Sequence, residues 1–307
     1  MVIAVVLVII AIGSVIFHIW SPWWFTPLAS NWGALDDAIV ITFWITGVAY
    51  VIVILFMAYC CWRYRYKKER RAHYEPENPK MEWWLSIVTA VGVVALLTPG
   101  LIAWNDFVTV PENVVEVEVL GKQWDWSYRL PGKDGKLGTS STRLVNDDNP
   151  FGINPKDPNG KDDVLIEGDD LHLKLDQPVK MLLRSIDVLH DFYVPQFRAK
   201  MDLVPGMVTF FWMTPTRAGT FDVLCAELCG VGHHAMRSTV VVDAEGAYDK
   251  WLSGQETFAA LYPKAANVRQ AAAGSPATEP VPNASQIGSQ EKTILTASES
   301  PSNRSVR

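Results

Sequence analysis

The sequence predicts a membrane α-helical hairpin with an extra N-terminal span, followed by an all-β sandwich or barrel. Residues 1–24, 38–62 and 83–105 contain no Lys, Arg, Asp or Glu. Each stretch is long enough to cross a hydrocarbon core, which takes roughly 20 helical residues. Beyond residue 105, apolar and polar residues alternate instead, which is typical of half-buried strands. The chain therefore has a lipid-facing part followed by a water-facing part.

The basic residues indicate how the spans are oriented. The first Lys or Arg in the chain is Arg63, which opens a short loop at residues 63–80 with seven basic and three acidic residues. A short basic loop between two spans stays in the cytoplasm, so residues 36–105 form a hairpin and the following domain lies outside. Residues 1–24 lack the basic start and a convincing cleavage site of a secretory signal. We therefore favour a retained span with its N-terminus inside over a cleaved signal.

The strands of the outer domain, residues 106–262, are predicted from short runs rich in β-branched or aromatic residues. These runs are residues 115–119, 171–175, 179–185, 207–213, 219–225 and 238–243. Several short strands at this spacing favour a sandwich or barrel. Residues 146–163 form a polar loop between strands, and residues 246–262 one amphipathic helix. Residues 263–307 are poor in large apolar residues, which predicts a disordered tail.

The candidate metal-binding residues lie in the run CAELCGVGHHAM, residues 225–236. A close pair such as Cys225 and Cys229 outside the cytoplasm often oxidises to a disulfide, and spacing alone leaves that open. Two thiols with an imidazole and a thioether nearby favour copper. Magnesium or calcium prefers oxygen ligands, and a structural zinc site does not normally recruit Met. The chain has no Cys-x-x-Cys-His motif, so no covalently bound haem is expected.

A second histidine ligand is expected upstream of this run. His190 follows the predicted strand 179–185 directly, so a loop at the end of that strand could bring its ring beside the ligand loop. Alone, such a histidine would more often be an exposed loop residue. Together with the downstream cluster, it is interpreted as a ligand.

With these residues in place, roughly residues 36–260 resemble subunit II of the haem–copper cytochrome c oxidases, as a divergent bacterial branch. That family joins a helical hairpin to a cupredoxin-like sandwich carrying a binuclear copper centre, CuA. Its signature is Cys-x-Glu-x-Cys-x-x-x-His-x-x-Met with an upstream His. The resemblance implies thiolate bridges from Cys225 and Cys229, one imidazole on each copper from His190 and His233, and weak ligation by Met236 and the Glu227 carbonyl.

The family pattern also settles two details of this ligand run. The family spacing selects His233 rather than the adjacent His234 as a ligand. The side chain of Glu227 is implied to reach a magnesium ion shared with subunit I.

Two matches lie away from the copper ligands. Residues 121–128, GKQWDWSY, resemble the family's aromatic patch, whose first Trp, here Trp124, is where electrons enter from cytochrome c. We expect Trp126 and Tyr128 to be plain core aromatics. Glu82, at the start of the second hairpin span, resembles a glutamate at the entrance of a proton channel into subunit I.

The resemblance implies the electron-entry subunit of a proton-translocating respiratory terminal oxidase. The chain would accept electrons one at a time from cytochrome c and pass them to the haem-containing subunit I, where oxygen is reduced to water. It would sit in the bacterial inner membrane with the copper domain in the periplasm, and no nucleic-acid partner is expected. Residues 105–262 contain 24 Asp and Glu against 15 Lys and Arg, a net formal charge of −9, which would attract a basic donor.

Three other classes of protein are weighed against this prediction. A quinol oxidase subunit II shares the hairpin and sandwich but lacks the copper ligands, whereas all six positions are filled here. A thioredoxin-type copper chaperone has Cys-x-x-x-Cys, but its histidine lies downstream and its strands alternate with helices. A structural adhesion or sensor domain would hold the two cysteines as a disulfide. Only a thiolate–copper centre would give the purified outer domain a colour.

Overall fold

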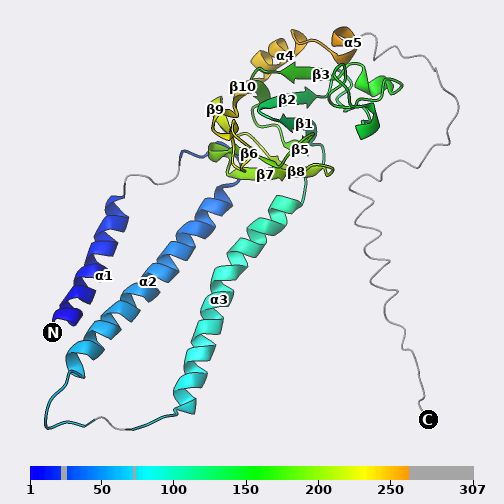
Figure 1. Cartoon of the computed structure of the whole chain (residues 1–307). Helices are drawn as coiled ribbons and strands as arrows, with labels where there is room; N and C mark the ends of the chain where they lie inside the picture. Colours follow the sequence, from blue (N-terminus) through cyan, green and yellow to red (C-terminus); the bar gives the residue numbers. More distant parts are fainter. Residues whose placement is uncertain (22–25, 72–73, 263–307) are drawn as a thin grey trace, which may run out of the picture. The chain divides into compact units, whose positions relative to one another are not determined.

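The computed structural model describes residues 1–21, 26–71 and 74–262 of the chain (Figure 1). The predicted disordered tail, residues 263–307, lies outside the described residues. Among the residues that the structure describes, three helices are long and apolar enough to cross a membrane: α1 (Val2–Trp20), α2 (Gly33–Arg63) and α3 (Pro79–Val108). The predicted hairpin and the additional N-terminal apolar helix are therefore confirmed, and the chain is a membrane-anchored protein.

Local sequence explains where α3 starts and how α1 packs against α2. Asn78 caps α3 by accepting a hydrogen bond from the Met81 N–H at 3.2 Å, and Pro79 occupies the first turn, where its missing N–H costs nothing. Small buried residues lie where α1 meets α2, among them Ala4 and Ala58. Small residues allow membrane helices to approach closely.

The water-facing part is a sandwich of two five-stranded sheets. One sheet has the order β3-β2-β1-β5-β8 and the other β4-β10-β9-β6-β7. The strands are β1 (Val115–Lys122), β2 (Asp125–Leu130), β3 (Val164–Glu167), β4 (Leu171–Lys174), β5 (Val179–Ser185), β6 (His190–Val194), β7 (Ala199–Leu203), β8 (Thr209–Met213), β9 (Gly219–Cys225) and β10 (Arg237–Asp243). β1 pairs with β5, and β10 with β4, in parallel; the other pairs are antiparallel.

The two-residue period of the strands builds the core. In β1, Val117 and Val119 point inward and are 1 % and 0 % exposed, and they meet aromatic residues such as Tyr128 and Phe192 from both sheets. Alternating apolar residues on two facing sheets form one continuous apolar layer. This layer supports the strand ends that carry the candidate site.

One predicted element differs from the structure. Residues 246–262 do not form a single helix but two, α4 (Glu245–Ser253) and α5 (Phe258–Leu261). α4 stops at Gly254, whose N–H bonds back to the Trp251 carbonyl, and Gly is a common residue at helix ends. The break lets Phe258 turn into a second apolar cluster with Phe151 and Ile153, where it is fully buried.

The outer face of the first sheet is covered by the segment between β2 and β3, residues 131–163, which includes the predicted polar loop. Buried charges tie this segment down. Arg129 pairs with Glu118 at 2.7 Å and with Asp163 at 2.8 Å, and Arg184 adds a second guanidinium to Glu118 at 2.5 Å. Two acids and two guanidiniums balance one another, as buried charges must.

The chain just before α2 belongs structurally to the sandwich. Ala29 exchanges backbone hydrogen bonds with Gln196 and Thr216, and the buried Trp32 donates its indole N–H to the Trp212 carbonyl at 2.9 Å. The Arg198 guanidinium binds both carboxylate oxygens of Asp36 at 2.6 and 2.9 Å. The first turn of α2 is thus fixed directly to the β-sandwich.

Candidate metal centre

Three neighbouring strands bring the candidate ligands to one end of the second sheet. β6 pairs with β9 in antiparallel register, with Phe192 opposite Cys225, so the start of β6, His190, lies beside the end of β9. β9 pairs with β10, and the Cys225 N–H bonds to the Met236 carbonyl at 3.3 Å. The sheet register alone therefore brings His190, Cys225 and Met236 together. The loop between β9 and β10 adds Cys229 and His233.

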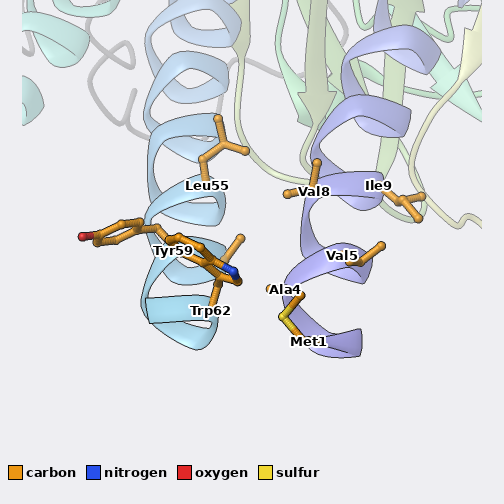
Figure 2. Close-up of a pocket in the computed structure, with 9 residues that line it drawn as sticks. Met1, Ala4, Val5, Val8, Ile9, Leu55, Tyr59 and Trp62 are labelled. Atoms are coloured by element: carbon orange, nitrogen blue, oxygen red, sulfur yellow. The ribbon is translucent and has the colours of Figure 1, made fainter. Parts of the chain in front are cut away.

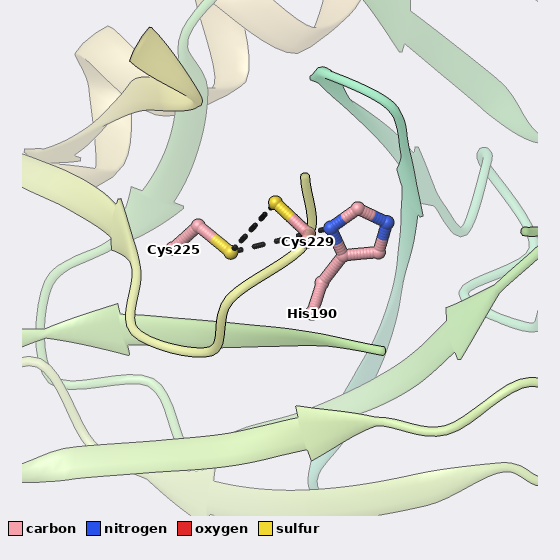
Figure 3. A group of neighbouring side chains, drawn as sticks. All are labelled: His190, Cys225 and Cys229. Carbon is pink, nitrogen blue, oxygen red and sulfur yellow. Dashed lines mark hydrogen bonds between the residues drawn. The ribbon is translucent and has the colours of Figure 1, made fainter. Parts of the chain in front are cut away.

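The two thiols form the middle of the cluster (Figure 3). Cys225 Sγ lies 3.7 Å from Cys229 Sγ, and both cysteines are free. Cys225 Sγ is 4.0 Å from Nδ1 of His190 and 3.2 Å from the Glu227 carbonyl oxygen. Ligand atoms of His190, Cys225 and Cys229 all lie within 4.8 Å of one another, which is a possible metal site.

The second cysteine has its own pair of neighbours. Cys229 Sγ lies 3.5 Å from Nδ1 of His233 and 3.8 Å from Sδ of Met236. His233 begins a short 3-10 helix, η4 (His233–Ala235), which turns its ring toward the sulfur. His234 is exposed. The structure thus brings His233 into the cluster beside Cys229.

Burial keeps the Cys229 thiol protonated when no metal is bound. His190, Cys229 and Met236 are 0 %, 2 % and 1 % exposed, whereas Cys225 and His233 are partly buried. Burial, with a further contribution from Cys225, raises the pKa of the Cys229 thiol to about 11. A thiol must lose its proton to bind a metal, so metal binding at this site would release protons.

A carboxylate fixes the orientation of the His190 ring. Asp187 Oδ1 lies 2.8 Å from Nε2 of His190, which leaves Nδ1 facing the sulfur of Cys225. Burial alone would raise the pKa of Asp187, but hydrogen bonds from His190 and from the Val188 and Gln123 N–H groups hold that pKa below its usual value. Such a partner on the far nitrogen orients a metal-binding imidazole and raises its basicity.

The turn between β1 and β2 lies against the ligand loop from the other side. Gln123 Nε2 and Trp124 Nε1 both donate to the Cys229 carbonyl, at 2.8 and 3.1 Å. Gly232 makes room for the indole, because a Cβ there would lie 2.3 Å from Trp124 Cδ2. Trp124 is 38 % exposed, so it joins the ligand loop to the protein surface.

The remaining residues singled out from the sequence lie elsewhere. Trp126 and Tyr128 are fully buried in the core, and the Trp126 ring packs edge-on 6.2 Å from His190. Glu82 is exposed in the first turn of α3. Roughly 40 Å of helix separate it from the sandwich end of α3, so it takes no part in the cluster.

The donor set fits copper. Two thiols, two imidazoles, a thioether and one carbonyl oxygen converge within contact distance, and the soft sulfur donors among them favour copper. The imidazole at the buried end is held by Asp187, and the Cys229 carbonyl is held by Gln123 and Trp124. A rigid, mostly buried sulfur-rich cluster of this kind suits a metal that changes charge with little movement of its ligands.

Sequence reasoning missed three contributors to the site. Gln123 and Gly121 lay within the aromatic motif, but their contacts with the Cys229 carbonyl and with the His190 ring depend on how two sheets meet. The third contributor is Asp187. Its position three residues before a candidate ligand was the available signal for a hydrogen bond to that histidine.

Comparisons with known proteins agree with this architecture. The family model described as cytochrome c oxidase subunit II, periplasmic domain, matches residues 115–244. The alternative cytochrome c oxidase subunit 2 of Bradyrhizobium diazoefficiens is 62 % identical over 269 residues, covering 88 % of this chain and 97 % of that relative. Cytochrome c oxidase subunit 2 of Cereibacter sphaeroides is 29 % identical over 238 residues, covering 74 % and 77 %.

A solved structure is also similar to the outer domain. The crystal structure of the periplasmic domain of cytochrome oxidase subunit II from Bradyrhizobium japonicum aligns with 47 % of this chain and 95 % of its own, at 24 % identity and a TM-score of 0.35. The family rests on the long, closely identical relative rather than on this alignment. The chain therefore belongs to the cytochrome c oxidase subunit II family, as a membrane-anchored subunit of an oxidoreductase complex.

Proposed function

We propose that this chain is the electron-entry subunit of a respiratory terminal oxidase and holds a binuclear copper centre, CuA. The observation that carries the proposal is the 3.7 Å separation of two free thiols, each with its own imidazole Nδ1 within 4.0 Å. When bound, a pair of copper ions would supply a centre that takes up and releases one electron at a time. The residues of this chain would hold and orient that centre.

Each ligand has a defined task in this proposal. Cys225 and Cys229 would hold both ions through their thiolates, His190 and His233 would each supply an imidazole to one ion, and Met236 would supply a thioether. The Glu227 carbonyl, 3.2 Å from Cys225 Sγ, would add a weak oxygen ligand. The side chain of Glu227 would hold a magnesium ion shared with subunit I, and no haem is expected on this chain. Asp187 keeps the His190 ring in its binding orientation.

Trp124 is the proposed entry point for electrons from cytochrome c. Its indole N–H reaches the carbonyl of one bridging cysteine at 3.1 Å, while more than a third of its surface remains open to a partner. Electrons then pass to the haem-containing subunit I, where oxygen is reduced to water. Glu82 lies at the proposed entrance of a proton channel on the opposite side of the membrane.

The proposed setting is the bacterial inner membrane, with the β-sandwich in the periplasm. The basic loop at residues 63–80 supports this orientation, because short basic loops stay in the cytoplasm. Association with the other oxidase subunits follows from membership of the family. The extra helix α1 crosses the same membrane and places Met1 on the side of the basic loop.

Rapid mixing of the whole oxidase with reduced cytochrome c tests the proposal. In the Cys225→Ser variant, haem reduction in subunit I should slow by several orders of magnitude, as happens when one member of a set of residues that act as a unit is removed. Cys60→Ser is the matched control, because Cys60 is also a free cysteine but lies near the C-terminal end of α2, far from the sandwich. Equal rates in both variants would overturn the proposed electron entry.

A further inference from the structure

A narrow apolar groove runs along the seam between α1 and α2, near the basic loop (Figure 2). Its volume is about 360 Å³, within the range of small-molecule sites, roughly 300–1,000 Å³. The groove spans Met1 to Ile9 on α1 and Leu55 to Trp62 on α2. At 1.5 Å per helical residue, this is about 11 Å along the helix axes.

The groove arises because small residues form its floor and large ones its walls. Ala4 and Ala58, 9 % and 5 % exposed, lie where the helices touch. Ile9 on one wall and Leu55 and Trp62 on the other remain 43–62 % exposed. Among the described residues, the Tyr59 hydroxyl and the Trp62 indole N–H are the polar side-chain groups that line this cavity. Such a lining suits a hydrocarbon chain.

The mouth of the groove carries positive charge without a protein counter-ion. The Arg65 guanidinium lies 3.7 Å from Sδ of Met1 and 3.3 Å from the Trp62 carbonyl, both uncharged acceptors. Arg63 lies over the Tyr64 ring. Within the described part of the chain, neither arginine forms an ion pair with a carboxylate. An anion from outside the chain would find two unpaired guanidiniums here.

We propose that this groove binds an anionic phospholipid, with one acyl chain between α1 and α2 and its phosphate against Arg63 and Arg65. Basic residues next to a membrane helix attract anionic headgroups, and apolar tails fill apolar surfaces between helices. A transmembrane helix is about 10–12 Å wide with its side chains, so a helix of another subunit would lie across the groove rather than fill it. The lipid would bind α1 to the hairpin.

Photolabelling of the whole oxidase tests this proposal. The complex is placed in phosphatidylcholine vesicles containing phosphatidylglycerol with a photoreactive acyl chain, and labelled peptides are identified by mass spectrometry. Label is expected on residues 1–9 and 55–62. Arg65→Gln should reduce it about fivefold, the effect of one basic residue at a membrane surface. Ala58→Leu, which fills the floor, should abolish it.

Two variants control for charge and for size. Lys68→Gln removes a charge from the same loop, and Ala49→Leu enlarges the same residue type on the opposite face of α2; both should leave the labelling of the groove unchanged. Absence of label in the groove of the wild type would overturn the proposal, because another subunit would then cover it. Equal labelling of the wild type and Arg65→Gln, or an equal loss in Arg65→Gln and Lys68→Gln, would also overturn it.

Discussion

Asp187 connects three parts of the proposed copper site. It accepts hydrogen bonds from the backbone N–H groups of Gln123 and Val188, at 2.6 Å each, and lies 2.8 Å from His190 Nε2. Its charge therefore orients the ring of one ligand and fixes the turn that carries Trp124. The family signature names the ligands but not this support, which depends on three loops meeting at one end of the sandwich.

We predict that Asp187→Asn weakens copper binding about 10- to 100-fold, the usual effect of removing a carboxylate from a metal-binding histidine. The amide is similar in size but lacks the charge that favours the binding form of the imidazole. Competition with a copper chelator measures the affinity. Asp222→Asn, at an exposed position on β9, is the control. An unchanged affinity in Asp187→Asn would refute the orienting role.

A second residue-scale prediction concerns Gly232. Gly232→Ala would place a methyl group 2.3 Å from the Trp124 ring, so the indole must move away from the ligand loop. We expect about 1–3 kcal/mol of destabilisation from overpacking, and slower electron entry from cytochrome c. Thermal unfolding and rapid mixing measure the two effects.

Gly246→Ala is the matched control, because a Cβ there meets nothing within 4 Å and Ala favours the α4 helix. This substitution should leave the stability of the protein unchanged or raise it slightly. If Gly232→Ala behaved like Gly246→Ala, Trp124 would not be seated against the loop as described.

At the scale of elements, the segment before α2 links the membrane part to the sandwich. Trp32 is 3 % exposed and packs edge-on against Trp212, with ring centroids 4.8 Å apart. A Trp close to a span end is typical of an interfacial anchor. Only the folded sandwich shows that this side chain belongs to its core.

We predict that Asp36→Asn destabilises the sandwich by about 1–3 kcal/mol, because it removes the charge from a two-pronged hydrogen bond with Arg198. The melting temperature of the full-length chain in detergent measures this. Asp37→Asn removes the same charge from the same turn, at an exposed position, and should change the melting temperature little. Equal shifts would indicate a helix-dipole effect rather than the Arg198 contact.

The buried charges show that the alternation of apolar and polar residues in a strand does not predict whether its polar face is covered. The alternation in residues 115–119 correctly predicts that Val117 and Val119 face the core, and it also predicts that Glu118 faces the other way. That outer face is covered by residues 131–163, so Glu118 is buried with Arg129 and Arg184. A two-residue period specifies the face of a side chain but not what lies over that face.

At the scale of the whole molecule, composition and motif predicted most of the architecture. Charge-free stretches longer than a bilayer core identified the helices, and the ligand run identified the loop after β9. Strands β3, β6 and β7 were not predicted; in β6 the second residue, Asp191, has a charged side chain that is nonetheless 1 % exposed. β2 was interpreted first as an aromatic motif. Whether such a segment forms a strand depends on how it is buried in the folded sandwich, and the local sequence pattern does not show this burial.

The acidic outer domain gives a prediction for the whole complex. With a net formal charge of −9 over residues 105–262, it should attract a basic cytochrome c at long range. Raising the ionic strength from about 0.01 M to 0.15 M shortens the Debye length from about 30 Å to 8 Å. The bimolecular rate of electron entry should therefore fall steeply. A rate that does not change with salt would contradict electrostatic docking.

Metal analysis of the full-length chain distinguishes a binuclear copper centre from a disulfide between Cys225 and Cys229. The full-length chain is purified in detergent and loaded with copper, and its metal content is measured together with its electron paramagnetic resonance spectrum. We predict two coppers per chain that share one unpaired electron, a signal lost in Cys225→Ser and retained in Cys60→Ser. A chain without copper, with Cys225 and Cys229 joined as a disulfide, would rule out the copper centre.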